Sequence, residues 1–172
     1  MKRLLAYLLL ALSFGFIFNT KADDISDFQI EGMSIGDSAL DYYNKKEIKK
    51  FMKTYYPKSR KFYLLENDTS KFQAYENVQF AFKKKDKTYV IHGIAGAIFY
   101  ENNIEECLKK FNEIKNDLNI IFKDTQIVEY GEKLVADGEA RQLGQIQYIF
   151  NDGAVISCEC TDWSEKMESK HG

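Results

Sequence analysis

The sequence has few proline, histidine and cysteine residues: one Pro, two His and three Cys among 172 residues. It also has no Cys-x-x-Cys pair and no glycine-rich phosphate loop. These absences exclude the motifs of thiol oxidoreductases and of P-loop nucleotide-binding proteins. We therefore expect a protein that is not an enzyme, with no catalytic residue, no cofactor and no bound metal.

Positive charge is not in excess either. Lys and Arg number 24 against 26 Asp and Glu, which gives a net charge of −2. This mild acidity argues against nucleic acids and anionic membranes as partners, because both bind clustered basic charge. The single basic run, Lys83-Lys84-Lys85, lies next to Asp86 and Lys87, and we interpret it as a solvated hairpin turn.

Residues 1–22 have the order of a secretory signal peptide. Lys2 and Arg3 precede an apolar run over residues 4–18, and small residues stand at the two positions before Asp23 that a signal peptidase reads, with Ala22 the last. The run is shorter than the roughly 20 residues that a spanning helix needs. We expect cleavage between Ala22 and Asp23 and a periplasmic or secreted product. A retained leader, which would give the only membrane contact, is the alternative.

The first half of the exported chain predicts two short helices. Asp37 or Ser38 can cap a helix that runs to about Tyr43, because their side-chain oxygens accept from free backbone N–H groups. Asn44 and Glu47 have capping-box spacing at the start of a second helix. Its apolar face is formed by three residues at helical spacing: Ile48, Phe51 and Met52.

Three strands are predicted next, over residues 61–66, 75–83 and 88–100. The second has the period-two pattern of a sheet with one buried face, which consists of Val78, Phe80 and Phe82. The polar stretch of residues 67–70 separates the first two strands.

The clearest helix in the sequence follows, with Asn102 or Asn103 as its cap and Glu105 and Glu106 in its first turn. Its apolar stripe comprises Ile104, Cys107, Leu108, Phe111, Ile114, Leu118 and Ile121. Such a stripe predicts a helix that lies across a sheet.

Three more strands are predicted over residues 125–130, 142–150 and 154–163, with a tight hairpin at residues 151–153. The fold class is therefore α+β: a mainly antiparallel sheet of about six strands, with one long helix and two short N-terminal helices packed on one face. We expect a single domain over residues 23–163 and a polar C-terminal tail over residues 164–172.

Cysteine provides the one chemical feature that stands out. In an oxidising compartment three thiols allow one disulfide. Cys107 lies on the helical stripe, and Cys158 and Cys160 point to the same face of the last strand. Strand direction favours Cys107–Cys160, with Cys158 as the alternative partner. A soft metal site formed by Cys158, Cys160 and His92 is a weaker alternative, because these residues lack the paired spacing of known sites.

Residues 27–38, Asp-Phe-Gln-Ile-Glu-Gly-Met-Ser-Ile-Gly-Asp-Ser, resemble a segment of small, uncharacterised secreted proteins of marine bacteria. No activity is known for that group, so the resemblance implies export alone. A fainter likeness links the Gly-Met-Ser segment, the two short helices and the three strands to periplasmic domains of the outer-membrane assembly-lipoprotein or β-lactamase-inhibitor type. Physically, Gly32 and Gly36 permit tight backbone paths, while Met33 and Ile35 can pack at the end of the sheet.

Taken together, these features predict an exported, non-catalytic domain that binds a protein, a peptide or an envelope component. The alternative is a carrier of a small apolar ligand, because aromatic residues make up 15% of the chain and can line a pocket between helix and sheet.

Overall fold

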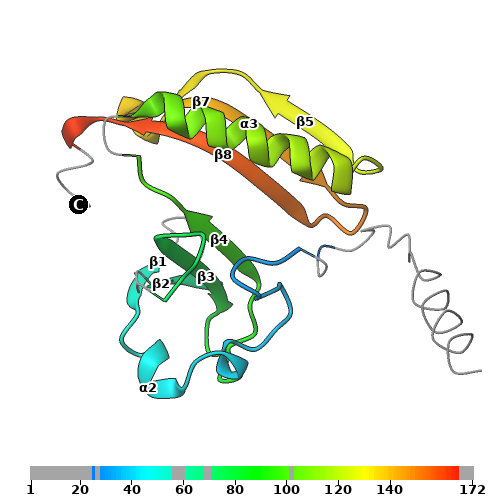
Figure 1. Ribbon diagram of the computed structural model, residues 1–172. Coiled ribbons are helices and arrows are strands. Elements are labelled where there is room, and N and C mark those ends of the chain that lie inside the picture. Colours follow the sequence, from blue (N-terminus) through cyan, green and yellow to red (C-terminus); the bar gives the residue numbers. More distant parts are fainter. Residues whose placement is uncertain (1–24, 26–27, 56–60, 68–70, 101–102, 167–172) are drawn as a thin grey trace, which may run out of the picture.

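The structure is a computed structural model and describes residues 25, 28–55, 61–67, 71–100 and 103–166. The leader, with the expected cleavage site between Ala22 and Asp23, lies outside the described residues. Figure 1 shows two antiparallel sheets, one above the other, with the long helix α3 lying along the upper one.

The N-terminal sheet is a meander in which each strand pairs with the next along the chain. Its strands are β1 (Met52–Tyr55), β2 (Phe62–Asn67), β3 (Asn77–Lys83) and β4 (Gly93–Ala97). The expected alternation in β3 is confirmed, because Val78, Phe80 and Phe82 are buried. They form the centre of a core that also includes Met33 and Ile48 from the preceding segment.

The short N-terminal helices are smaller than expected. Ser38 caps a single 3-10 turn, η2 (Ala39–Asp41), by accepting from the Leu40 N–H group. The second helix, α2 (Lys45–Ile48), is only four residues long.

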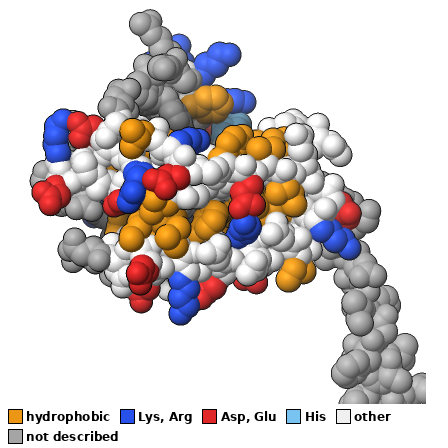
Figure 2. Space-filling view, turned by 90° about the horizontal axis from the view of Figure 1, so that it is seen from above, with side chains coloured by type: hydrophobic (Ala, Val, Ile, Leu, Met, Phe, Trp, Pro, Cys, Tyr) orange, Lys and Arg blue, Asp and Glu red, His pale blue; other side chains and the backbone are white. Residues whose placement is uncertain are grey.

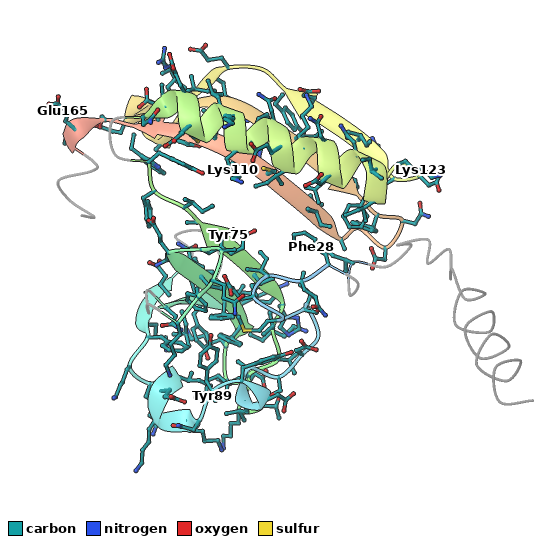
Figure 3. The ribbon with its side chains drawn as sticks, in the orientation of Figure 1. Phe28, Tyr75, Tyr89, Lys110, Lys123 and Glu165 are labelled. Carbon is teal, nitrogen blue, oxygen red and sulfur yellow. A yellow bond between two sulfur atoms is a disulfide. The ribbon has the colours of Figure 1, made fainter. Side chains whose placement is uncertain are left out.

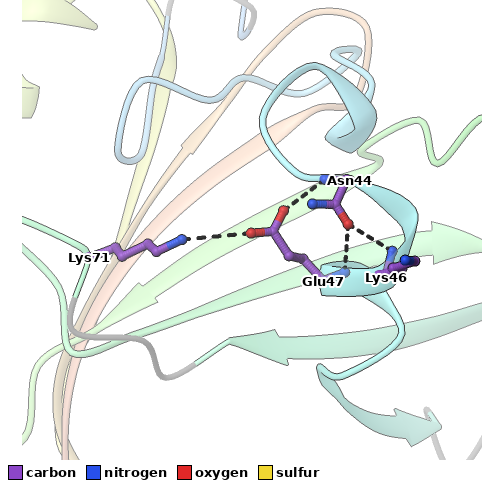
Figure 4. Close-up of polar contacts among 4 residues, drawn as sticks. All are labelled: Asn44, Lys46, Glu47 and Lys71. Carbon is purple, nitrogen blue, oxygen red and sulfur yellow. Dashed lines mark hydrogen bonds and ion pairs between the residues drawn. The ribbon is translucent and has the colours of Figure 1, made fainter.

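The capping box at the start of α2 is confirmed (Figure 4). The Asn44 Oδ1 atom accepts from Lys46 N at 2.9 Å and from Glu47 N at 3.1 Å, and Glu47 Oε2 accepts from Asn44 N at 2.9 Å. Glu47 also pairs with Lys71 across 3.7 Å, so it ties α2 to the chain before β3.

Two boundaries in this half were wrong. Met52 was expected on the second helix, but it begins β1. Three apolar residues at helical spacing are too few to distinguish a longer helix from a short helix that is followed directly by a strand. The strand expected over residues 88–100 is reduced to β4, because the Asp86 carboxylate and Ser38 hold Thr88 and Val90 in a turn instead.

The C-terminal half begins with α3 (Ile104–Ile121), and its cap is Asn103, one of the two residues expected for that position. Its strands are β5 (Gln126–Tyr130), β6 (Lys133–Val135), β7 (Ala140–Ile149) and β8 (Val155–Trp163), with a 3-10 turn, η3 (Ala136–Gly138), between β6 and β7. Strands β5 and β6 pair with successive stretches of β7, and β8 also pairs with β7. The hairpin between β7 and β8 is confirmed, with Gly153 at a φ of 86°.

Helix α3 packs on β7 and β8 through most of its predicted stripe. Gly144 on β7 admits the Phe111 ring, since a Cβ atom there would lie 3.1 Å from it. The buried Tyr148 hydroxyl donates to Asn119 Oδ1 at 2.8 Å. Ile121 was wrongly assigned to the buried stripe: it is 51% exposed at the end of the helix.

The expectation of one sheet of about six strands was also wrong, because the strands form two sheets with separate buried clusters. A helix after β4 can return the chain to the same sheet or start a new one, and the pattern of hydrophobic residues is the same in both cases. Here the chain starts a new sheet.

Phe28 and Tyr75 lie between the two sheets (Figure 3). Phe28 packs against both buried clusters and meets the Phe122 ring edge-on, with the centroids 6.4 Å apart. Burial raises the pKa of Tyr75, with a smaller contribution from Cys158 on β8. The two sheets are therefore joined by aromatic contacts as well as by the chain between β4 and α3.

The first residues of the expected C-terminal tail are held in place. Ser164 N donates to the Glu139 carbonyl at 2.9 Å, its hydroxyl bonds Glu139 Oε2 at 3.0 Å, and Lys166 pairs with the same carboxylate. The rest of the tail, residues 167–172, lies outside the described residues.

Hydrophobic side chains are also exposed on the side of the molecule that carries α3 and β5, where Figure 2 shows them among acidic and basic groups. The large ones at the end of α3 and along β5 and β6 are Ile120, Ile121, Ile127 and Leu134. Among the described helices, none is both long and apolar enough to cross a membrane.

Candidate functional site

The structure joins the cysteine pair that strand direction favoured. The sulfur atoms of Cys107 and Cys160 lie within bonding distance, and their Cα atoms are 5.9 Å apart, which is in the usual range for a disulfide. This is consistent with the expected Cys107–Cys160 bond, and it ties the first turn of α3 to β8. Cys158 is the free cysteine.

Cys158 is poorly suited to nucleophilic or metal chemistry. Burial raises the pKa of its thiol to about 11, with a smaller contribution from Glu159, so the thiolate is scarce at neutral pH. Cys160 is already bonded. In the described part of the chain, no group of three or more His, Cys, Asp and Glu side chains could hold a metal.

His92 is not brought to a cysteine. Its exposed imidazole meets the Phe62 ring edge-on, with the centroids 5.6 Å apart, at the end of the N-terminal sheet. The soft metal site of Cys158, Cys160 and His92 is therefore not assembled, and the same is true of a Cys–His nucleophile pair.

Ser34 was not among the candidate residues, although residues 32–36, Gly-Met-Ser-Ile-Gly, match the Gly-x-Ser-x-Gly motif of a nucleophile elbow. An elbow places its serine on a turn between a strand and a helix, with the hydroxyl exposed. Here Ser34 is buried, its hydroxyl donates to the Phe28 carbonyl at 3.3 Å, and it follows the turn of Glu31 and Gly32 that the Ile30–Met33 bridge closes. The motif is therefore structural.

The described part of this segment, residues 28–38, also makes contacts within the protein. The Glu31 carboxylate accepts from the backbone N–H groups of Gln73, Ala74 and Tyr75, at 2.7 to 3.2 Å. These bonds, those from Gln73 first, lower the pKa of Glu31. Asp37 does not act as the helix cap: its carboxylate accepts from Ser34 N and the Tyr42 hydroxyl. The segment fastens the N-terminal sheet, in agreement with a packing role.

The surface that stands out lies on the C-terminal sheet, on the face opposite α3. Register pairs its side chains in three cross-strand rows, which we call the solvent face. Each row has one residue from β5, one from β7 and one from β8: Tyr130, Gln145 and Glu159; Val128, Gln147 and Ser157; Gln126, Ile149 and Val155. All nine are exposed or half-buried, with Tyr130 38% and Val155 43% exposed.

A hydrogen-bond network orders one end of this face. Glu159 Oε2 accepts from Gln142 Nε2 at 2.6 Å and from Gln145 Nε2 at 3.2 Å. Lys133 Nζ donates to Gln145 Oε1 at 3.3 Å and lies 4.9 Å from the centroid of the Tyr130 ring. These side chains are thus held in place by contacts with one another.

The sequence pattern predicts these three strands but does not indicate the solvent face. Its members come from three strands, and only the register between those strands shows that they are neighbours. No family model, no curated protein and no solved structure matches this chain. Its function is therefore inferred from its own residues.

Proposed function

We propose that this protein is exported, loses its leader after Ala22, and acts outside the reducing cytosol as a non-catalytic domain that binds a protein partner through the solvent face. The signal-like order of residues 1–22 and the disulfide between Cys107 and Cys160 support export. The position of Cys158, Ser34 and His92 in separate structural contacts supports a non-catalytic role.

The composition of the solvent face carries the proposal. Charged residues make up 29% of the chain, yet Glu159 is the one charged residue among the nine positions. An ordinary wet sheet face contains more charge, whereas the buried centre of a protein interface is poor in charge and rich in aromatic residues. Three glutamine amides, a tyrosine ring and three branched aliphatic side chains give such a centre both hydrogen bonds and apolar area.

Pre-ordering of the face supports binding further. Association costs free energy for each flexible side chain that becomes fixed, at about 0.5–1.5 kcal/mol each. Gln145 and Glu159 are already fixed by the network that includes Gln142 and Lys133. Binding of a partner therefore costs less free energy, because folding has already fixed these two side chains.

The carrier alternative receives less support. The buried aromatic side chains that the structure describes pack against one another in the two cores, as in the pairs Phe80–Phe82 and Phe122–Phe150, with centroids 6.0 and 5.4 Å apart. Such pairs fill the space between helix and sheet. An enclosed pocket lined by Phe and Tyr would favour the carrier.

Photo-crosslinking tests the proposal. The full chain is produced in its own cells with p-benzoylphenylalanine at Gln147 or Ser157 on the solvent face, or at Asn112 on the exposed side of α3 as the matched control. We expect a discrete crosslinked protein from the first two positions and not from the control. Its loss when Gln145 is changed to Arg in the Gln147-labelled chain would support the assignment, because the charge would be buried on binding.

Two outcomes would contradict the proposal. One is the same crosslinked species from Asn112 as from Gln147, which would show that the contact is not specific to the solvent face. The other is the absence of any species from both Gln147 and Ser157, provided that the labelled proteins are exported and unfold at the wild-type temperature.

A further inference from the structure

A second surface, on the N-terminal sheet, has the opposite chemistry. An open hollow of about 500 Å³ lies at the end of the β2–β3 pair, and we call it the lysine hollow. Its lining residues are Lys61, Phe62, Lys83, Lys84 and Lys85.

Strand pairing builds the hollow from two separate parts of the sequence. Phe62 and Lys83 are cross-strand partners, and Lys84 N donates to the Lys61 carbonyl at 2.8 Å. Lys61 therefore joins the run of Lys83 to Lys85, and four lysine residues line one hollow in a protein whose net charge is −2.

Acidic side chains do not neutralise the charge of Lys83, Lys84 and Lys85. Within the described residues, no carboxylate pairs with Lys83, Lys84 or Lys85. Asp86 is the acid of the same turn, but its oxygens accept from Thr88 N at 2.8 Å, Thr88 Oγ1 at 2.6 Å and Val90 N at 2.9 Å. The lysines consequently attract an anion from solution.

The hollow also has an apolar component. Phe62 is half-buried at its base, with His92 packed edge-on against the ring, and the aliphatic stems of the lysines extend its apolar area. A free inorganic anion would use the ammonium groups and leave this apolar surface in water. An apolar body that carries an anionic head would use both.

Lys85 provides an independent indication that side-chain charge matters here. Its φ is 72°, in the left-handed region where glycine and asparagine are favoured and lysine is uncommon. The chain that follows Lys85 is fixed by the Asp86 carboxylate and by the bond from the Ser38 hydroxyl to the Thr88 carbonyl at 2.6 Å. A lysine therefore occupies a left-handed position that glycine or asparagine, both uncharged, would adopt more easily.

We propose that the lysine hollow binds an anionic amphiphile: its apolar body lies on Phe62 and its phosphate or carboxylate head is held by Lys83, Lys84 and Lys85. This site is separate from the solvent face and does not depend on it. The amphiphile is bound as a single molecule, so a membrane surface is the competing source of the same head group.

Titration followed by amide NMR signals tests the site, with dodecyl phosphate below its micelle concentration as the probe. Inorganic phosphate tests the head alone and dodecyl maltoside tests the apolar chain alone. We expect dodecyl phosphate to bind about tenfold or more tightly than either, with shifts centred on residues 61–62 and 83–85. Equal affinity for inorganic phosphate, or shifts centred elsewhere, would overturn the proposal.

Lys85→Asn is the decisive variant, and Lys123→Asn, which removes the same charge beyond the end of α3, is its matched control. Because Asn tolerates the left-handed conformation, Lys85→Asn should keep the wild-type stability or exceed it while it weakens dodecyl phosphate binding severalfold. Unchanged affinity in this variant, or the same loss in Lys123→Asn, would overturn the proposal.

Vesicles distinguish the source of the head group. Vesicles of phosphatidylcholine and vesicles that also contain phosphatidylglycerol are compared by co-sedimentation. If the anionic vesicles bind while monomeric dodecyl phosphate does not, the hollow contacts a membrane surface, and the proposal of a single bound amphiphile is wrong. Binding of the monomer with no co-sedimentation would support it.

Discussion

Tyr75 lies so close to Gly96 that a Cβ atom on Gly96 would be 2.4 Å from the Tyr75 ring. Gly96 is on β4, and Tyr75 lies between the two sheets (Figure 3). The missing side chain of Gly96 therefore allows the ring to fill this junction. No other residue type fits here without displacement of the ring.

Gly96→Ala should destabilise the protein by about 1–3 kcal/mol, because the added methyl group overpacks a filled site. Gly131→Ala is the matched control, since a Cβ atom there would meet nothing within 4 Å. Urea unfolding measures both free energies. A midpoint for Gly96→Ala equal to that of the control would show that the Tyr75 ring does not depend on this contact.

Loss of the disulfide should cost more. The double change Cys107→Ala and Cys160→Ala removes a cross-link between residues 53 positions apart, and we expect a loss of about 2–4 kcal/mol in the free energy of unfolding. Cys158→Ala leaves the bond intact and should cost about 1 kcal/mol. If the double variant unfolds at the same urea concentration as the wild type, the bond does not stabilise the fold.

Cys158 should make the protein less stable at alkaline pH. Burial raises the pKa of its thiol from the ordinary 9.0 to about 11, so the folded state favours the protonated form. Its contribution to stability is complete below pH 9 and is lost as the pH rises through about 11. Alkylation of the native protein by iodoacetamide should therefore reach half its maximum rate near pH 11. A half-maximum at or below pH 9, the ordinary value, would contradict the burial of this thiol.

Glu31 should make the protein less stable at acidic pH. Its pKa is lowered from 4.5 by backbone hydrogen bonds, those from Gln73 first, so ionised Glu31 favours the folded state. This contribution is present above pH 4.5 and is lost as the pH falls through the lower folded value. Glu31→Gln should therefore be less stable than the wild type at pH 7, and the difference should shrink in acid. A difference that is the same at pH 7 and pH 3 would mean that the carboxylate charge has no part.

The sequence predicted those parts of the fold that depend on local pattern. The α3 cap at Asn103, the Asn44 capping box and the buried face of Val78, Phe80 and Phe82 all follow from residues a few positions apart. The two-sheet arrangement did not follow, because the direction taken by the chain after Tyr100 depends on tertiary packing. The early end of α2 was missed for the related reason that β1 pairs with β2, which lies later in the chain.

The two candidate surfaces could not be predicted from the sequence either, because they too depend on tertiary structure. Gln147 and Ser157 are neighbours on the solvent face only because of strand register. Lys61 joins Lys83 only across the β2–β3 pair, and the net charge of the chain concealed that local gathering of positive charge. The Cys107–Cys160 pair could be chosen because strand direction, which the pattern does give, was enough to rank two partners.

Export can be tested most directly by mass spectrometry of the protein recovered from cells that make the full chain, digested without reduction. We expect an N-terminus at Asp23 and one disulfide-linked peptide pair that contains Cys107 and Cys160, with Cys158 as a free thiol. An intact chain that still begins at Met1, recovered from the cytosol with all three thiols reduced, would contradict export. It would also mean that neither proposed binding surface acts outside the cytosol.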